Sequence, residues 1–495
     1  MIDFRQVTLA YALSAITQNR ALKVAYNYDG KYFAEAVANN SGYNRYAPGK
    51  QFGWFYAFGL GWQMANESFI KDNIDAISSW KWRATYGRTG NSNVDASGYY
   101  IFRQTYSTGN GGWSGEYAGY QIGSNRSFTQ GYDSDALANP FITWEKANKF
   151  NVGVDIGLFK DKFMITADYY NDKYFDLVGL RGKTTAVLGI PYTNENIGIN
   201  RYYGGELTLT YKGNINNFNY FISANGSIQA SKVLFADEIQ TGSPGSTRTG
   251  RPVGTSFAYE FVGFYKDDAD VANSAHVQGI SAVLRPGDMK YKDQLTLDTD
   301  GDGVLDAADG VINQFDQIPV AGTKPLIYYG STLGFNYKGF SLSVILQGVQ
   351  NRMVFISNAY TRPFQGFANG FGIPSQPYGQ AYANAFNRWT PETAATATLP
   401  RLSLENNTNN DPSFNGTNSS FYYKKANYFR IKNAEIGYAL PYSITNRLSV
   451  AGIRLFVNGE NLFTTTDFAF GDPEVYNVGS YPIQRVISAG ITVKL

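Results

Sequence analysis

The chain has 495 residues, including 38 tyrosines, 34 phenylalanines and 52 glycines, and its formal net charge at pH 7 is only +2. This composition favours β-strands and tight turns over helices, and so small a net charge argues against a nucleic-acid binder. Cysteine is absent, which excludes disulfides and thiolate metal sites. No run of about 18 apolar residues predicts a transmembrane helix. Residues 1–20 lack the features of a signal peptide, so we expect an exported form to have a further N-terminal part.

Side chains alternate between apolar and polar along the whole chain, and this period of two predicts strands. In 54–62, every second residue from Trp54 to Trp62 is large and apolar, whereas most of the residues between them are small. In chain order, further alternating segments lie at 151–158, 163–170, 206–212, 332–338 and 484–495. A soluble protein of two packed sheets would alternate in the same way, so alternation alone does not place the chain in a membrane.

The connections between the alternating segments distinguish these two possibilities. Outer-membrane barrels have short turns at one end and long loops at the other. Here short connections alternate with long ones, apart from a medium turn near 63–79. We therefore predict an all-β fold, an antiparallel transmembrane β-barrel of about 14 strands with long extracellular loops. The short connections are 29–31, 160–162, 213–217 and 338–340, and the long ones are about 89–140, 177–200, 232–325 and 353–425.

Aromatic residues stand near many of the expected strand ends. In a barrel they fit girdles at the membrane interfaces, where an amphipathic ring lies at head-group level. The alternative is that tyrosine simply suits strands. The residues concerned are Tyr26, Tyr28, Trp80, Trp82, Trp144, Tyr169, Tyr170, Tyr202, Tyr203, Tyr328, Tyr329 and Tyr428.

Several long segments resemble, in the same order, the SusC/RagA-type TonB-dependent outer-membrane transporters. Residues 78–91, SSWKWRATYGRTGN, are similar to a family signature that ends in Y-G-x-x-G-N. Residues 139–178 resemble the N-P-x-L-x-W-E stretch and the hairpin that follows it. GDMKYKD, running into DTDGDG, is similar to G-D-x-x-Y-x-D…N-G-D-G. Residues 329–348, 427–441, 453–475 and 481–495 resemble the later strands.

The resemblance implies the C-terminal part of a TonB-dependent receptor barrel over residues 1–495. The family's plug domain, TonB box and early strands have no counterpart here, and Leu495 stands where an aromatic residue is usual. The family barrel has about 22 strands, so we expect a fragment whose strands form an open arc. Open strand edges cannot face lipid, because each unpaired backbone group there is costly.

The function implied by the resemblance is nutrient import across the bacterial outer membrane. The expected partners are outer-membrane lipid, a SusD-like surface lipoprotein, a glycan or peptide ligand, and the TonB complex through the missing N-terminal part. We expect no nucleic-acid partner, no enzyme activity and no required cofactor. Two alternatives remain: a passive pore of about 14 strands, with a strand near 5–15 paired to 484–495, and a secreted calcium-binding β-protein such as an adhesin.

The acidic stretch DTDGDGVLDAAD, residues 298–309, has nearly the spacing of an EF-hand calcium loop, but no helical pattern flanks it. Gly303 would make the sharp turn of such a loop. We expect a Ca²⁺ site that stiffens one long loop, and the alternative is a solvated acidic turn. The expected ligands are carboxylates of Asp298, Asp300, Asp302 and Asp309, the carbonyl of Val304, and Asp306 through water.

Other candidate sites are weaker. The sole histidine, His276, has no second imidazole for a catalytic triad or zinc site, so we expect a surface loop residue. The glycine-rich segment 242–256 lacks the G-K-[ST] of a phosphate loop. Polar residues of the barrel interior are candidates for contact with a glycan or peptide, although each is also ordinary for a lumen. These are Asp168, Tyr170, Glu206, Glu460 and the loop 353–425.

Overall fold

The computed structural model describes residues 15–92, 100–108, 119–122, 127–130, 132–239, 245, 247–279, 283–356, 383–402, 409–410, 419–475 and 481–495. Within these residues, thirteen strands form one antiparallel sheet in chain order, close to the predicted number and of the predicted class. The strands are β1 (Thr17–Tyr28), β2 (Tyr32–Tyr43), β3 (Phe52–Gln63), β4 (Ile77–Asn91), β9 (Glu145–Leu158), β10 (Phe163–Gly179), β11 (Glu195–Ile215), β12 (Phe218–Phe235), β19 (Leu326–Tyr337), β20 (Phe340–Gln350), β23 (Tyr428–Ala439), β24 (Gly452–Thr465) and β25 (Val486–Lys494).

The strand register places the large apolar side chains of neighbouring strands on the same side of the sheet. Trp62 of β3 lies opposite Trp82 of β4, which lies opposite Val154 of β9. At the other end of the sheet, Val457 of β24 lies between Ile436 and Ala489. We call this side the apolar face and the opposite side the polar face. Apolar side chains that remain exposed over a whole sheet face are typical of the lipid-facing surface of a barrel.

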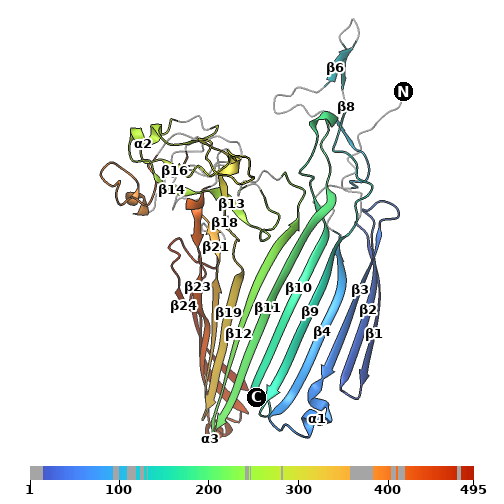
Figure 1. The fold of residues 1–495 in the computed structure, drawn as a ribbon. Helices are drawn as coiled ribbons and strands as arrows, with labels where there is room; N and C mark the ends of the chain where they lie inside the picture. Colours follow the sequence, from blue (N-terminus) through green and yellow to red (C-terminus); the bar gives the residue numbers. More distant parts are fainter. Residues whose placement is uncertain are drawn as a thin grey trace.

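The sheet curves into an open arc (Figure 1). In the described part of the chain, β1 pairs only with β2, and β25 pairs only with β24. A closed pore of about 14 strands would instead pair its first strand with its last. The strand expected near residues 5–15 falls largely on residues outside the described ones. The described strands therefore match the expected open arc, and the pairing that the closed pore requires is not tested by them.

Short and long connections lie at opposite ends of the arc, as predicted (Figure 1). At the short-turn end, Lys338 and Gly339 both have positive φ, which fits the two-residue turn that best follows strand twist. The short-turn connections are 29–31, 64–76, 159–162, 216–217, 338–339 and 440–451, and the long-loop connections are 44–51, 92–144, 180–194, 236–325, 351–427 and 466–485. The sequence reading missed 44–51 and 466–485.

Helices are short and confined to the connections. The α-helices are α1 (Ser68–Lys71), α2 (Asp268–Ala272) and α3 (Tyr442–Thr445). Among the described residues, no helix is long and apolar enough to cross a membrane. The long loops also contain short strands: β5 (Tyr106–Thr108), β6 (Gly119–Ile122), β7 (Ser127–Gln130), β8 (Tyr132–Ser134), β13 (Ser256–Tyr259), β14 (Phe261–Phe264), β15 (His276–Val277), β16 (Met289–Tyr291), β17 (Val311–Ile312), β18 (Gln317–Ala321), β21 (Met353–Phe355) and β22 (Tyr423–Lys425).

The two longest connections, 236–325 and 351–427, pack together into a unit that we call the loop subdomain. The Tyr291 hydroxyl donates a hydrogen bond to the carbonyl of Asn409 at 2.5 Å. The buried Asp288 carboxylate lies 2.7 Å from the Arg401 guanidinium. Both contacts join one connection to the other. The shared core consists of Tyr259, Val277, Met289, Tyr291 and Ile312 from the first connection and Leu399, Phe421 and Tyr422 from the second.

The predicted aromatic girdle is only partly realised. Tyr26, Tyr28 and Trp82 lie exposed on the apolar face. Trp144 is instead buried among aromatic and aliphatic residues at the long-loop end, and Tyr428 is buried and accepts a hydrogen bond from Gln347. The prediction is therefore wrong for Trp144 and Tyr428, which the long loops cover. It is also wrong for Tyr170, Tyr202 and Tyr328, which lie on the polar face.

Candidate functional site at the long-loop end

The polar face carries charged groups that connect neighbouring strands. Arg83 of β4 donates a hydrogen bond to Asp155 of β9 at 2.7 Å and to Asp168 of β10 at 3.0 Å. Gly153 lies between Arg83 and Asp168 in the register. A Cβ at this glycine would lie 2.4 Å from the Asp168 carboxylate, so the absence of a side chain lets the guanidinium bridge across β9. Asp168 thus supports the wall of the sheet.

A cavity of about 830 Å³ lies where the polar face meets the loop subdomain. Its volume is in the range typical of ligand sites. Four adjacent strands supply its wall, through Tyr170 of β10, Tyr202 of β11, Gln229 and Ser231 of β12, and Tyr328 of β19. Residues 252–254, 321–325 and 351–355 supply its cover.

The chemistry of the cavity suits a polar ligand with an acidic group. Lys324 and Arg352 line it, and no Asp or Glu is among the described lining residues. The tyrosines add ring faces for stacking and hydroxyls for hydrogen bonds. Of the residues that the sequence suggested for ligand contact, Tyr170 and residues 353–355 and 423 of the loop 353–425 line the cavity, whereas Asp168, Glu206 and Glu460 do not.

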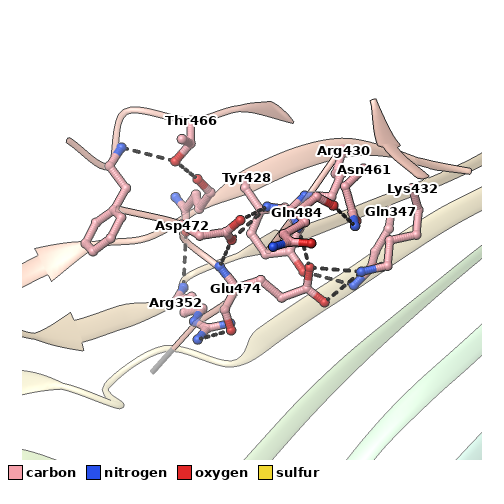
Figure 2. A network of polar contacts seen from close by, with 12 residues as sticks. Gln347, Arg352, Tyr428, Arg430, Lys432, Asn461, Thr466, Asp472, Glu474 and Gln484 are labelled. Carbon is pink, nitrogen blue, oxygen red and sulfur yellow. Dashed lines mark hydrogen bonds and ion pairs between the residues drawn. The ribbon is translucent and has the colours of Figure 1, made fainter. Parts of the chain in front are cut away.

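Beside this cavity, a polar network holds the connection 466–485 against β23 (Figure 2). Its centre is Arg430, whose side chain is only 1% exposed. One guanidinium nitrogen donates to both oxygens of Asp472 at 2.7 and 2.8 Å, and the other donates to Glu474 at 2.8 Å. Lys432 lies 3.2 Å from the same Glu474 carboxylate. A buried cation is tolerated only when it is paired and hydrogen-bonded in this way.

Arg352 links the network to the cavity. Its guanidinium donates to the main-chain carbonyl of Glu474 at 3.1 Å while the residue lines the cavity. At this point of the wall, Arg430 and Lys432 thus contact two carboxylates, and Arg352 contacts a main-chain carbonyl of the same connection. The sequence reading named neither Arg352 nor Arg430, because nothing in strand periodicity shows which arginine becomes buried beneath a distant loop.

Three of the predicted calcium ligands lie together in the structure. One oxygen from each of the exposed residues Asp298, Asp300 and Asp302 lies within 4.8 Å of the others. Asp298 also accepts hydrogen bonds from the amides of Gly301 and Gly303 at 2.7 and 2.9 Å. A bridge between residues 297 and 307 closes the loop, in place of the two helices of an EF-hand.

The other predicted ligands have different roles. The Asp306 carboxylate accepts a hydrogen bond from the Thr299 hydroxyl at 2.6 Å, and Asp309 accepts one from the amide of Val311. Neither belongs to the described cluster of three aspartates. The amide of Val304 donates to Asp302, and nothing tests the role of its carbonyl. Calcium binding at this loop stays a prediction.

The remaining candidates are surface loops. His276 is exposed, and its Nε2 lies 2.7 Å from the carbonyl of Val271. Part of the glycine-rich segment, 242–244 and 246, lies outside the described residues. So do residues 357–382, 403–408 and 411–418 of the loop predicted at 353–425.

The chain is similar in sequence to TonB-dependent receptors, although no family model matches it. TonB-dependent receptor P3 of Formosa agariphila is 26% identical over 505 residues, covering 95% of this chain and 45% of the relative. TonB-dependent receptor SusC of Bacteroides thetaiotaomicron is 23% identical over 486 residues, covering 95% of this chain and 43% of the relative. The chain thus spans about half the length of the curated relatives that it matches.

A solved structure of the RagAB peptide transporter has the same fold over 96% of this chain and 47% of its own, with a TM-score of 0.69 and 19% identity. These relatives are receptors and transporters of the outer membrane rather than enzymes, which agrees with the predicted class and location. A secreted adhesin is accordingly not supported. The chain is thus related to the SusC-type TonB-dependent receptors and has the fold of a portion of their outer-membrane β-barrel.

Proposed function

We propose that this chain forms part of the wall of an importer that takes up glycans or peptides across the outer membrane. In this proposal, a SusD-like lipoprotein delivers the ligand from outside, and the TonB complex supplies the energy. The observation that carries the proposal is the cavity of about 830 Å³ at the long-loop end. It lies on the polar face, which in outer-membrane barrels is the lumen side.

The cavity would receive a ligand at the mouth of the barrel. Tyr170 and Tyr328 can stack on sugar rings or peptide side chains, and Gln229 can hydrogen-bond to hydroxyl or amide groups. Lys324 and Arg352 favour a carboxylate or another anionic group on the ligand. Because the loop subdomain covers the cavity, movement of the loops would govern entry.

Binding to the purified full chain in detergent tests the proposal. The ligands are a panel of neutral oligosaccharides, uronic-acid oligosaccharides and short peptides, measured by isothermal titration calorimetry. We expect Tyr328→Ala to weaken binding by about five- to tenfold, because an aromatic contact contributes about 1 kcal/mol beyond its area. Arg352→Gln should weaken acidic ligands more than neutral ones.

Tyr211→Ala is the matched control, because Tyr211 is exposed in β11, on the apolar face opposite Ile222 and Phe163. It should leave every affinity unchanged. The proposal fails if no glycan or peptide binds. It also fails if Tyr328→Ala and Tyr211→Ala have the same effect on the ligand that does bind.

A further inference from the structure

The apolar face is hollowed near the short-turn end of β1 to β4. A groove of about 440 Å³ lies there, and its volume is again that of a ligand site. Its floor is one row of the register, where Ala34, Leu60 and Ala84 lie opposite one another. The next row toward the turns is aromatic and stands above this floor: Tyr32, Trp62 and Trp82.

Hydrogen bonds fix the aromatic wall of the groove. Glu67, in the connection between β3 and β4, accepts a hydrogen bond from the Tyr32 hydroxyl at 2.5 Å and from the Trp62 indole at 3.1 Å. The Tyr32 hydrogen bond is the largest cause that lowers the pKa of Glu67, so this carboxylate stays charged at neutral pH. Rings held in this way lose little freedom on binding, and the groove is therefore formed before a ligand arrives.

A cationic side chain lies at the turn end of the groove. Lys31 follows the β1–β2 turn, directly before Tyr32, and its ammonium lies 3.5 Å from Asp29 and 3.6 Å from Glu67. These distances are longer than those of a hydrogen-bonded ion pair, so the ammonium can also contact another anion. The groove thus combines an apolar channel with a cluster of one ammonium and two carboxylates at its interfacial end.

The location of the groove on the barrel indicates which kind of ligand it can bind. Short turns face the periplasm in outer-membrane barrels, and Ala34 lies three residues, or about 10 Å, along the strand from Lys31. This is the distance from the head-group level into the hydrocarbon. We propose that the groove binds one zwitterionic phospholipid of the periplasmic leaflet, with an acyl chain over Ala34, Leu60 and Ala84 and its head group at the charge cluster around Lys31.

A lipid is the expected occupant because the groove is part of the apolar face. The apolar face of an outer-membrane barrel already borders lipid, and the groove is continuous with it. Elsewhere on this face, protruding side chains such as Leu207 and Tyr211 leave an acyl chain only a transient contact. A second hollow, of about 580 Å³, lies over β23 to β25 and is lined by larger side chains such as Ile436, Leu455 and Val457. The small floor and the fixed aromatic wall distinguish this place, so its lipid should be retained when bulk lipid is exchanged for detergent.

Native mass spectrometry of the full chain in detergent, titrated with palmitoyl-oleoyl phosphatidylethanolamine, tests the inference. We expect one saturable lipid per chain. Ala34→Phe fills the floor and should lower the occupancy by about tenfold, because a blocked groove loses apolar contact. Ala224→Phe is the matched control, since Ala224 is an exposed alanine between Leu209 and Ser331 on β12, outside the groove. Lys31→Gln should weaken the phospholipid but not an uncharged diacylglycerol.

Circular dichroism and heat-dependent gel migration verify that each variant is folded. If Ala34→Phe does not fold, Ala84→Leu fills the same floor with a smaller side chain and is expected to lower the occupancy as well. Equal lipid binding by the groove variant and Ala224→Phe overturns the inference. Binding without saturation, or equal competition by lipid A of the outer leaflet, overturns it too. The lipid-binding test does not depend on the proposed import function, because the groove and the cavity lie on opposite faces of the sheet.

Discussion

Removing the positive charge of Arg430 should release the connection 466–485 from the barrel wall. Arg430→Met keeps most of the side-chain length but leaves two carboxylates without their principal partner. Removing one member of a buried ion pair typically costs about 3–5 kcal/mol. Asp472 and Glu474 are 11% and 25% exposed, and Lys432 still neutralises Glu474. We therefore expect a local cost of about 2–3 kcal/mol, lower than that range.

Amide hydrogen exchange of residues 466–475, read by mass spectrometry, measures this local opening. A cost of about 2–3 kcal/mol corresponds to exchange that is about 30- to 140-fold faster. Lys432→Met is the control, because the contacts of Lys432 with Glu474 are longer, at 3.2 and 3.3 Å, and its side chain is 35% exposed. It should accelerate exchange by less than about fivefold. Asp472→Asn and Glu474→Gln, added to Arg430→Met, should restore part of the protection. Equal, small effects of Arg430→Met and Lys432→Met would refute the reasoning.

Three further predictions concern the wall, the loop subdomain and the acidic loop. Gly153→Ala should push Arg83 away from Asp168 and lower the free energy of unfolding in detergent by about 1–2 kcal/mol. Gly205→Ala, whose Cβ would meet nothing nearer than 3.6 Å, should cost less in the same urea titration. Burial raises the pKa of Tyr265 to about 12, from about 10 in an unfolded chain. The stability that this tyrosine contributes is therefore complete below pH of about 10 and is lost as the pH rises toward 12. Tyr265→Phe should flatten this alkaline loss, as followed by near-ultraviolet circular dichroism of the full chain; an unchanged profile would contradict it. Calcium titration by calorimetry should show one site that Asp300→Ala weakens by about tenfold or more, whereas Asp268→Ala in α2 should have no effect. If the native chain and Asp300→Ala bind Ca²⁺ with equal affinity, or if neither binds it, the predicted calcium site is wrong.

The architecture could be predicted from the sequence because successive side chains of a strand point to opposite faces, so their polarity shows which face is apolar. Alternation with a period of two, seen from Trp54 to Trp62 and again at 484–495, indicates both the strand and its apolar side. Connection lengths then predicted which ends carry the long loops. The predicted bounds of these loops differ from the observed ones by a few residues. For example, β12 continues to Phe235, beyond the last residues whose alternation predicted a strand.

The candidate site was predicted less well, because it is made by contacts between distant segments. Tyr170 was named from its place on the polar face. Arg352 and Arg430 acquire their roles through the segment 472–474, which is more than 40 residues away from either. Trp144 was assigned to a girdle because the sequence does not show which strand ends the loops cover. The acidic loop was predicted from local spacing, and the three aspartates closest in sequence do lie together.

The shared core of the loop subdomain has a consequence for the order of folding. Tyr291 and its partner Asn409 are 118 residues apart in sequence. Closing so large a loop in an unfolded chain has a large entropic cost, and the contacts that offset this cost form only after closure. The β19–β20 hairpin lies between the two halves of the core and brings their bases together once it has formed. The loop subdomain should therefore acquire its native packing only after these two strands have paired, late in the assembly of the wall.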